Sequence, residues 1–287
     1  MKQLTVISGK GGTGKTTITA AFAALAKNKV MADADVDAAD LHLILTPSIE
    51  KEEDFYGGRV PCLDKNLCDE CRLCIEHCRF EAIQDFVIDL IACEGCGVCA
   101  QICPKNAIAM KDNLCGRWFI SQTRFGPLVH ARLGIAQENS GKLVTLVRQQ
   151  ARLIAEKEKR DYIIIDGPPG IGCPVISSIG GVDLVLAVTE PTLSGIHDLE
   201  RILGVARHFK VPAMVCVNKS DINPENTTRI RQYCDKNDIR MVGEIPYDRA
   251  VIQAMVAGKA VVEYDAGPAA TEIKKLWKEV ESCLLQQ

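Results

Sequence analysis

The chain has 287 residues, of which 47% are hydrophobic, and its formal net charge at pH 7 is −3. This length suits one large α/β domain with a small second domain, and the weak charge excludes a general polybasic affinity for nucleic acid or lipid. No apolar stretch approaches the roughly 20 residues that span a bilayer. We therefore expect no membrane or nucleic-acid partner. Because the start, MKQLTVISGKGG, lacks the charged region and long apolar run of a signal peptide, we also expect a cytoplasmic protein.

The first predicted elements enclose a phosphate-binding loop. LTVIS (4–8) predicts a buried strand, GKGGTGKT (9–16) follows, and TTITAAFAALAKN (16–28) predicts a helix. The loop matches the GxxxxGKS/T motif in the strand-to-helix context that makes it specific, and its backbone amides would bind nucleotide phosphates. The expected nucleotide contacts are Gly9, Lys10, Gly11, Gly12, Thr13, Gly14, Lys15, Thr16 and Thr17.

Three side chains of this loop have distinct expected roles. Lys15 would pair with the β- and γ-phosphates, the Thr16 hydroxyl would coordinate Mg2+, and Thr17 would reach an α-phosphate oxygen. KVMADAD (29–35) then predicts a second short strand that ends in carboxylates. The sequence therefore predicts a magnesium–nucleotide site near the ends of these strands.

Eight cysteines follow in the pattern CxxCxxCxxxC, which occurs twice. CRFEAI (78–83) and CPKNAI (103–108) repeat at the same offset of 25 residues as the cysteines, which indicates a duplicated half. In the bacterial two-cluster pattern, the fourth cysteine of each run ligates the other cluster. We therefore expect two 4Fe–4S clusters, one held by Cys68, Cys71, Cys74 and Cys103 and the other by Cys93, Cys96, Cys99 and Cys78.

Residues 60–112 resemble bacterial-type ferredoxins, with one departure at Arg79, where proline usually closes the run as it does at Pro104. Two other uses of the cysteines fit less well. Zinc takes four ligands in spaced pairs and does not use a third CxxC step followed by a cross-over cysteine. A disulfide framework belongs to oxidising compartments, unlike the cytoplasm. The nine acidic and five basic side chains of this segment favour a partner with a basic docking face.

Strands and helices alternate again after the cysteines. Helical material is expected near 140–158, and strands are expected at DYIIID (161–166), VDLVLAVT (182–189), PAMVCVN (212–218) and IRMVGEIP (239–246). Valine- and isoleucine-rich strands that alternate with helices predict a doubly wound, mostly parallel sheet covered on both faces. We therefore expect an α/β P-loop domain at 1–59 and 113–287, interrupted by a small α+β ferredoxin domain at 60–112.

The string KGGTGKT (10–16) resembles the deviant Walker A loop of the MinD, ParA and nitrogenase iron protein superfamily. This resemblance implies an ATP-sandwich dimer in which Lys10 reaches the nucleotide of the partner. The partner would be a second copy of this chain or a similar ATPase. The alternative is that Lys10 is a solvated loop residue.

The same resemblance assigns roles at two further strand ends. In DADVDAAD, Asp35 would orient the attacking water, and Asp33 would support the loop and the magnesium waters. In IIIDGPPG, Asp166 would hold Mg2+ through water, and Gly170 would offer its amide to the γ-phosphate. The expected catalytic residues of the ATPase are Lys10, Lys15, Asp35 and Asp166.

Recognition of the base is open between two interpretations. VNKSD (217–221) looks like the NKxD string with which GTPases recognise guanine, whereas related ATPases of the MinD type carry an asparagine here that contacts adenine. We expect ATP, with Asn218 and Pro246 beside the base and Asp248 as a further candidate.

The whole chain resembles MinD-type P-loop ATPases with an inserted ferredoxin domain. The segments that carry this resemblance are KGGTGKT, the cysteine runs, DGPPGIGCP and GRWFISQTRFGPLVHARL (116–133). The resemblance implies an ATPase with two clusters. By analogy with the nitrogenase iron protein, our leading hypothesis is that its ATP and ADP states control electron transfer through these clusters, with a redox or metallocluster protein as partner. One alternative is an ATP-dependent scaffold or carrier in metal-cluster assembly, for which Cys173 is a candidate ligand outside the insert. Another is a MinD-like regulatory switch that senses redox state.

Overall fold

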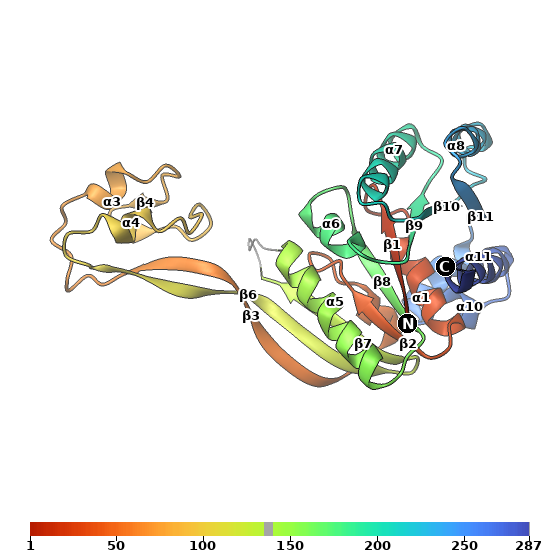
Figure 1. Ribbon diagram of the computed structural model, residues 1–287, viewed down its shortest axis with the longest axis horizontal. Coiled ribbons are helices and arrows are strands. Elements are labelled where there is room, and N and C mark those ends of the chain that lie inside the picture. Colours follow the sequence, from red (N-terminus) through yellow and green to blue (C-terminus); the bar gives the residue numbers. More distant parts are fainter. Residues whose placement is uncertain (135–139, 287) are drawn as a thin grey trace. The chain divides into compact units, whose positions relative to one another are not determined.

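The computed structural model describes residues 1–134 and 140–286, which fold into two compact units (Figure 1). The sheet unit comprises Met1–Glu52, Trp118–Arg132 and the chain from Ser140 onward. The cysteine unit comprises Glu53–Arg117 and a short segment that begins at Leu133. Each unit has a hydrophobic core of its own.

A nine-stranded sheet runs through the described residues in the order β11-β10-β9-β1-β8-β2-β7-β6-β3. Its strands are β1 (Lys2–Ser8), β2 (Lys29–Asp33), β3 (Ser48–Leu63), β6 (Ile108–Thr123), β7 (Gly126–Leu133), β8 (Tyr162–Pro169), β9 (Leu184–Thr189), β10 (Ala213–Asn218) and β11 (Arg240–Ile245). Every neighbouring pair from β11 to β7 is parallel. The prediction of a mostly parallel α/β sheet is therefore confirmed.

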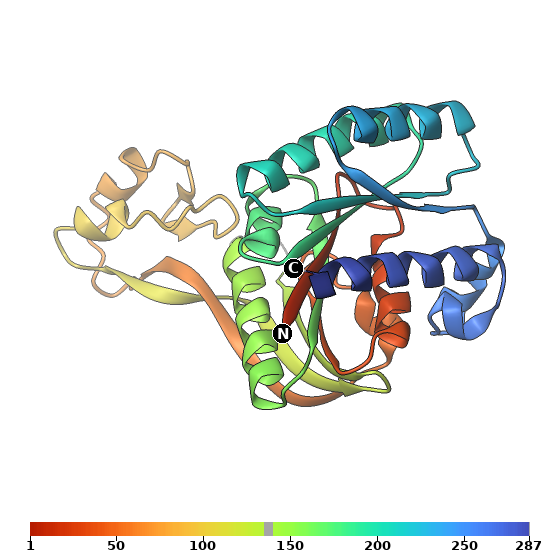
Figure 2. The ribbon, with the colours of Figure 1, turned by 45° about the vertical axis from the view of Figure 1, so that its right-hand side comes forward.

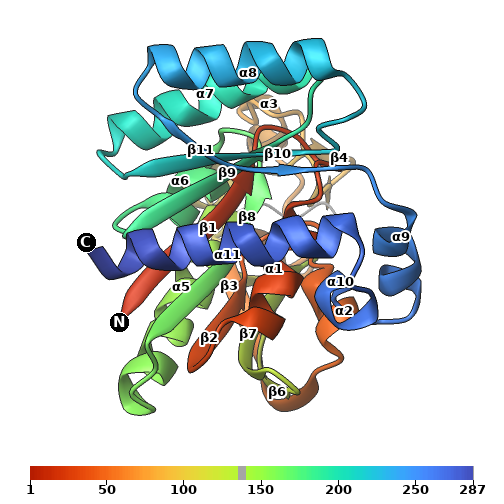
Figure 3. The ribbon, with the colours of Figure 1, turned by 90° about the vertical axis from the view of Figure 1, so that its right-hand side faces the viewer.

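Helices cover both faces of this sheet (Figures 2 and 3). One layer contains α1 (Lys15–Leu25), α2 (Leu41–Leu45), α9 (Arg249–Val256), α10 (Val261–Tyr264) and α11 (Pro268–Gln286). The other contains α5 (Ser140–Lys157), α6 (Cys173–Ile179), α7 (Leu193–His208) and α8 (Pro224–Lys236). Figure 3 shows α11 across one side of β9–β11 and α7 and α8 over the other side. Because strands such as β8 are covered on both faces, their residues are buried without alternation, as at 162–168 in β8.

The C-terminal helix α11 packs on the sheet unit. Its buried residues include Ile273, Leu276, Trp277 and Val280, whose spacing places them on one helical face. The ring of Trp277 lies 5.0 Å from that of Phe22 in α1. In the described parts of the chain, no helix is both long enough and apolar enough to cross a membrane. The cytoplasmic location stays a prediction.

Two long strands lead into and out of the cysteine unit. β3 begins in the sheet unit at Ser48 and ends in the cysteine unit at Leu63, whereas β6 begins at Ile108 and returns to the sheet unit at Thr123. β6 then turns through Arg124 and Phe125 into β7. The charged stretch at the start of β3 has no apolar alternation, so its strand structure follows from pairing with β6 rather than from local propensity.

The duplication in the sequence is visible inside the cysteine unit. The short helix α3 (Leu73–Glu76) contains the third cysteine of the first run, and α4 (Val98–Gln101) contains the third cysteine of the second. These helices contact each other. β4 (Ile83–Gln84) pairs antiparallel with β5 (Val87–Ile88), and the small core includes Cys74, Ile83 and Ile108. The unit therefore has few buried apolar residues around its cysteines.

Candidate functional site

Five parallel strand ends converge at one edge of the sheet. The phosphate-binding loop follows β1, Asp33 ends β2, Asp166 lies in β8, Glu190 follows β9, and Asn218 ends β10. Since the carboxyl ends of parallel strands meet at one edge, these residues share a region of the surface. A pocket of about 550 Å³ lies there, which is within the size range of cavities that bind small molecules.

Glycines allow the loop after β1 to fit between its neighbours. Gly12 and Gly14 have positive φ values of 79° and 91°, in the left-handed region that side chains disfavour. A Cβ on Gly14 would come within 2.2 Å of Nδ2 of Asn218, and one on Gly9 would come within 2.3 Å of Cβ of Asp198. The loop is therefore packed from the side of β10 and from the side of α7.

Lys15 is the buried cation of the pocket. Its side chain is 7% exposed, and its Nζ lies 3.0 Å from Oδ2 of Asp35 and 3.6 Å from Oδ1 of Asp166. Burial opposes the charged form of Lys15, but the carboxylates of Asp166, Asp35 and Asp33 outweigh it and raise the pKa. Lys15 therefore carries a permanent positive charge, as phosphate binding requires.

Asp33 organises the loop that follows β2. It is completely buried, and its two carboxylate oxygens accept the N–H groups of Asp35 and Leu41, each at 3.2 Å. Burial, and then the charge of Asp166, raise the pKa of Asp33 well above its ordinary value. Burial also raises the pKa of Asp35, although Lys15 opposes this effect. Asp33 thus holds the loop while Asp35 lines the pocket.

The carboxylate of Asp166 has one engaged oxygen and one without a partner. Its Oδ1 accepts the hydroxyl of Thr19 at 3.0 Å, whereas its buried Oδ2 has no hydrogen-bond partner in the described chain. A buried oxygen of this kind fits a hydrated Mg2+ ion, because magnesium sites use carboxylates together with several waters. Thr16 in the pocket wall would supply the hydroxyl ligand.

Most of the expected nucleotide contacts lie in the pocket wall. These are Gly11, Gly12, Thr13, Gly14, Lys15, Thr16, Thr17, Asn218 and Pro246, and the expected catalytic residue Asp35 lies in the same wall. The wall also has an apolar part that no sequence motif marks, formed by Leu43, Val251, Ile252 and Met255 together with Tyr247. Apolar side chains next to a few polar groups suit the flat face of a nucleotide base.

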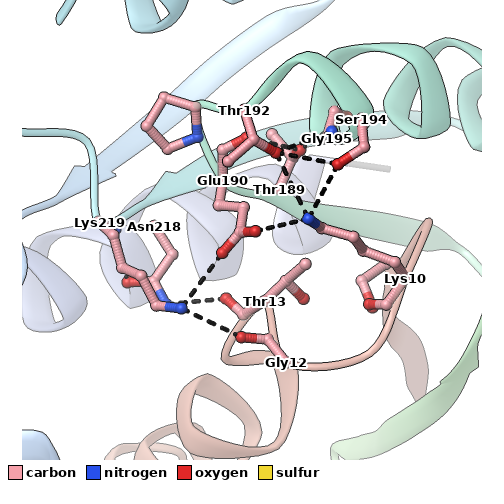
Figure 4. A network of polar contacts seen from close by, with 12 residues as sticks. Lys10, Gly12, Thr13, Thr189, Glu190, Thr192, Ser194, Gly195, Asn218 and Lys219 are labelled. Carbon is pink, nitrogen blue, oxygen red and sulfur yellow. Dashed lines mark hydrogen bonds and ion pairs between the residues drawn. The ribbon is translucent and has the colours of Figure 1, made fainter. Parts of the chain in front are cut away.

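Lys10 and Gly170 lie outside this wall, as does Gly9. Lys10 turns toward the loop after β9, where its Nζ lies 2.6 Å from Oε1 of Glu190 (Figure 4). The amide of Gly170 donates to the carbonyl of Ser8 at 2.9 Å. A contact between Lys10 and a partner's nucleotide, or between Gly170 and a γ-phosphate, therefore requires a rearrangement. Both roles stay proposals.

The side chains of the NKSD string are engaged within the protein. Asn218 donates through Nδ2 to the carbonyl of Thr13 at 2.8 Å, and Oδ1 of Asp221 accepts the N–H of Tyr247 at 2.7 Å. Each carboxylate oxygen has two lone pairs, so this bond leaves Asp221 able to accept from a base. The choice between adenine and guanine therefore stays a prediction. Asp248, the further candidate for the base, caps α9 by accepting the N–H of Ala250 at 2.9 Å.

The eight cysteines of the two runs line two separate cavities. Cys68, Cys71, Cys74 and Cys103 line one, and Cys78, Cys93, Cys96 and Cys99 line the other. The fourth cysteine of each run thus lies with the first three of the other run. Four thiols around a cavity fit a 4Fe–4S cube, in which each thiolate binds a different iron. No described group of three or more His, Cys, Asp and Glu side chains forms a site for a single metal ion.

The other thiols differ in their exposure. Cys216 and Cys234 are buried in the sheet unit, where burial raises both pKa values, that of Cys234 to about 11. They therefore stay protonated. Cys115 is buried, whereas Cys62 and Cys173 are exposed.

Known proteins provide an independent comparison. The chain matches the model of the CobQ/CobB/MinD/ParA nucleotide binding domain over residues 4–270. An uncharacterized protein of Methanocaldococcus jannaschii is 32% identical over 282 residues, which cover 97% of this chain and 96% of that protein. The iron-sulfur cluster carrier protein of Pyrococcus abyssi is 25% identical over 289 residues, which cover 93% of this chain and 81% of that protein.

Among solved structures, the septum site-determining protein MinD complexed with Mg-ADP from Pyrococcus horikoshii OT3 aligns with a TM-score of 0.61. The alignment covers 98% of this chain and 96% of that chain at 19% identity. Similarity at this level shows a shared fold.

Proposed function

The chain belongs to the CobQ/CobB/MinD/ParA family of nucleotide-binding domains, and on that premise we propose that it is an ATPase that couples ATP hydrolysis to electron transfer through two 4Fe–4S clusters. The active form would be a dimer of this chain, or of this chain and a similar ATPase, with the nucleotides between the two subunits. Its partner would be a redox protein or a metallocluster protein.

One observation carries this proposal: a phosphate-loop pocket and two cavities with four cysteines each occur in the same chain. Residues 60–112 would be the ferredoxin domain, and residues 1–59 and 113–287 would be the ATPase domain. When bound, the clusters would supply one-electron chemistry. The N–H groups of Glu70 and Ala107 donate to Sγ of Cys68 at 3.4 Å and of Cys103 at 3.3 Å, and hydrogen bonds to ligand sulfurs help to set the reduction potential of a cluster.

ATP hydrolysis requires alignment and charge stabilisation more than a strong base. The loop amides and Lys15 would bind the phosphates, while Thr16 and Asp166 would hold Mg2+. Asp35 lies in the pocket wall next to Lys15, so its carboxylate would orient the attacking water. Lys10 would complete the site of the partner subunit and stabilise the charge that develops on the phosphates.

A short covalent path would connect the two activities. Asp33 accepts the N–H of Leu41 at the start of α2, and β3 begins soon after α2 at Ser48. β3 then continues into the cysteine unit and ends at Leu63, shortly before Cys68. If phosphates draw Lys15 away from Asp35, the loop between β2 and α2 would rearrange at the start of this path. Continuity provides a route, and coupling itself has to be measured.

One anaerobic preparation, analysed for iron, EPR signals and nucleotide turnover, tests the proposal. Two stable clusters predict about eight irons per chain and the EPR signals of reduced 4Fe–4S centres. ATP turnover should exceed GTP turnover, because the resemblance to MinD-type ATPases implies a position of Asn218 beside adenine. Zinc in place of iron would contradict the cluster assignment, and GTP preference would contradict the choice of ATP.

The similarity to an iron-sulfur cluster carrier protein favours one second candidate, an ATP-dependent carrier of clusters. In that case an additional labile cluster would be shared between subunits, with the exposed Cys173 as a ligand. Transfer of radiolabelled iron to an apo-ferredoxin distinguishes the candidates. A relay keeps its iron through repeated ATP turnover, whereas a carrier loses it to the acceptor, and Cys173→Ala would stop that loss.

A further inference from the structure

Glu190 joins two lysines beside the phosphate-binding loop (Figure 4). Its Oε1 lies 2.6 Å from Nζ of Lys10, and its Oε2 lies 3.2 Å from Nζ of Lys219. The three residues follow β9, β1 and β10, which are neighbours in the sheet, so the topology brings them together. The side chain of Glu190 is only 16% exposed. Burial raises its pKa, but its bonds to the two lysines outweigh burial and lower it.

All hydrogen-bond donors of the Lys10 ammonium are engaged within its own subunit. Besides Glu190, its Nζ contacts the hydroxyl of Ser194 at 3.1 Å and that of Thr192 at 3.4 Å. An ammonium group has three donors, so none remains for a phosphate. Lys10 therefore has to leave these partners before it can contact a nucleotide on another subunit.

We propose that Glu190 is a positioning residue that retains Lys10 in its own subunit and thereby raises the ATP concentration needed to form the active dimer. This inference rests on the proposed dimer, in which Lys10 acts on the partner's nucleotide. The charge on ATP and the surface of a second subunit would compete with Glu190 for Lys10. Release of Lys10 then becomes part of dimer formation.

Lys219 makes this release reversible. Its Nζ also donates to the carbonyl of Gly12 at 3.2 Å, so Glu190 and Lys219 tie the loops after β9 and β10 to the phosphate-binding loop. When Lys10 leaves, the carboxylate of Glu190 keeps Lys219 as a partner. An unpaired, largely buried carboxylate is thus avoided, which limits the free-energy cost of the change.

The first test measures the accessibility of Lys10 without nucleotide. Acetylation with acetic anhydride, quantified by mass spectrometry, should label Lys10 about two to five times faster in Glu190→Gln than in wild type, because a weak ion pair of this kind shifts equilibria by about that factor. In Lys219→Met, Glu190 keeps its ion pair with Lys10, so the labelling rate of Lys10 should stay as low as in wild type. Asp183→Asn is the matched control, since Asp183 pairs with Lys2 at 3.5 Å at the opposite end of β9.

The second test measures dimer formation by analytical ultracentrifugation over a range of ATP concentrations. Glu190→Gln should reach half-maximal dimer at about one half to one fifth of the wild-type ATP concentration, and Asp183→Asn should behave as wild type. The role of Glu190 would be overturned if Lys10 were labelled at the wild-type rate in Glu190→Gln. It would also be overturned if the labelling rate of Lys10 rose equally in Glu190→Gln and Lys219→Met. A wild-type chain that stays monomeric with ATP would instead contradict the proposed dimer.

Discussion

The ammonium of Lys15 lies 3.0 Å from the carboxylate of Asp35, so the phosphate-binding loop and the loop after β2 are joined by a buried ion pair. In the proposed function, the phosphates of a nucleotide would compete with Asp35 for this cation. Nucleotide binding would then act on the loop that leads, through α2, into β3 and the cysteine unit.

Asparagine at position 35 should separate binding from turnover. Asp35→Asn removes the competitor for Lys15, which remains close to Asp166, so ADP affinity should rise about three- to tenfold. Turnover should fall about a hundredfold or more, because the residue proposed to orient the attacking water is lost. Isothermal titration and a phosphate-release assay measure the two effects. Asp37→Asn, in the exposed part of the same loop, is the control, and a parallel loss of binding and turnover in Asp35→Asn would contradict this role.

Removal of the Lys10 side chain should abolish turnover but spare binding. Lys10 lies outside the pocket wall, so the affinity of Lys10→Ala for ADP should stay within about twofold of wild type, while ATP hydrolysis falls on the order of a hundredfold or more.

Mixed dimers test whether Lys10 acts on the partner's nucleotide. Lys10→Ala contributes an intact Asp35, and Asp35→Asn contributes an intact Lys10, so each mixed dimer contains one complete site. A 1:1 mixture should recover about a quarter of wild-type turnover, since about half of the dimers formed are mixed. A mixture that is as inactive as its components would refute the trans role.

The arrangement of the cysteine cavities predicts which substitutions affect the same cluster. Cys103→Ala should leave the same residual EPR spectrum as Cys68→Ala, and Cys78→Ala should leave the same spectrum as Cys93→Ala. In each variant the iron content should fall from about eight to about four per chain. If Cys103→Ala resembled Cys93→Ala instead, each run would hold its own cluster and the crossed assignment would be wrong.

Alanine at position 14 should weaken both the fold and nucleotide binding. A side chain there combines a positive φ of 91° with a contact of 2.2 Å to the amide of Asn218, so the thermal midpoint should fall by about 3–10 °C. Gly11→Ala is the matched comparison, because its Cβ meets nothing within 4 Å, and its thermal midpoint should stay close to that of wild type. Equal midpoints for the two variants would show that Gly14 is not constrained in this way.

The sequence was sufficient to predict features that depend on local patterns. Valine- and isoleucine-rich runs such as residues 161–166 predict the parallel strands, and the strand-loop-helix context predicts the position of Lys15. The spacing of the cysteines also anticipates how the structure groups them around two cavities. The strands and the loop depend on neighbours along the chain, whereas the grouping of the cysteines follows from the spacing of the two repeated runs.

Contacts between distant residues were not predictable in this way. Glu190 belongs to no motif, and its ion pair with Lys10 exists only because β1 and β9 are neighbours in the sheet. The first residues of β3 form a strand because they pair with β6. Their own sequence is charged and shows no alternation of apolar and polar side chains. The N–H of Gly170 donates to the carbonyl of Ser8. This hydrogen bond depends on the alignment of β8 with β1, which the DGPPG string does not specify.

The central claim is that the nucleotide state changes electron transfer through the clusters. EPR-monitored redox titration of one anaerobic sample, without nucleotide, with Mg-ADP and with a non-hydrolysable Mg-ATP analogue, tests it most directly. We predict that the analogue shifts the midpoint potential of at least one cluster by about 60 mV or more, which is a tenfold change for a one-electron couple, and that Asp35→Asn reduces this shift. Identical potentials in all three states, together with identical rates of cluster oxidation by a common acceptor, would contradict the coupling.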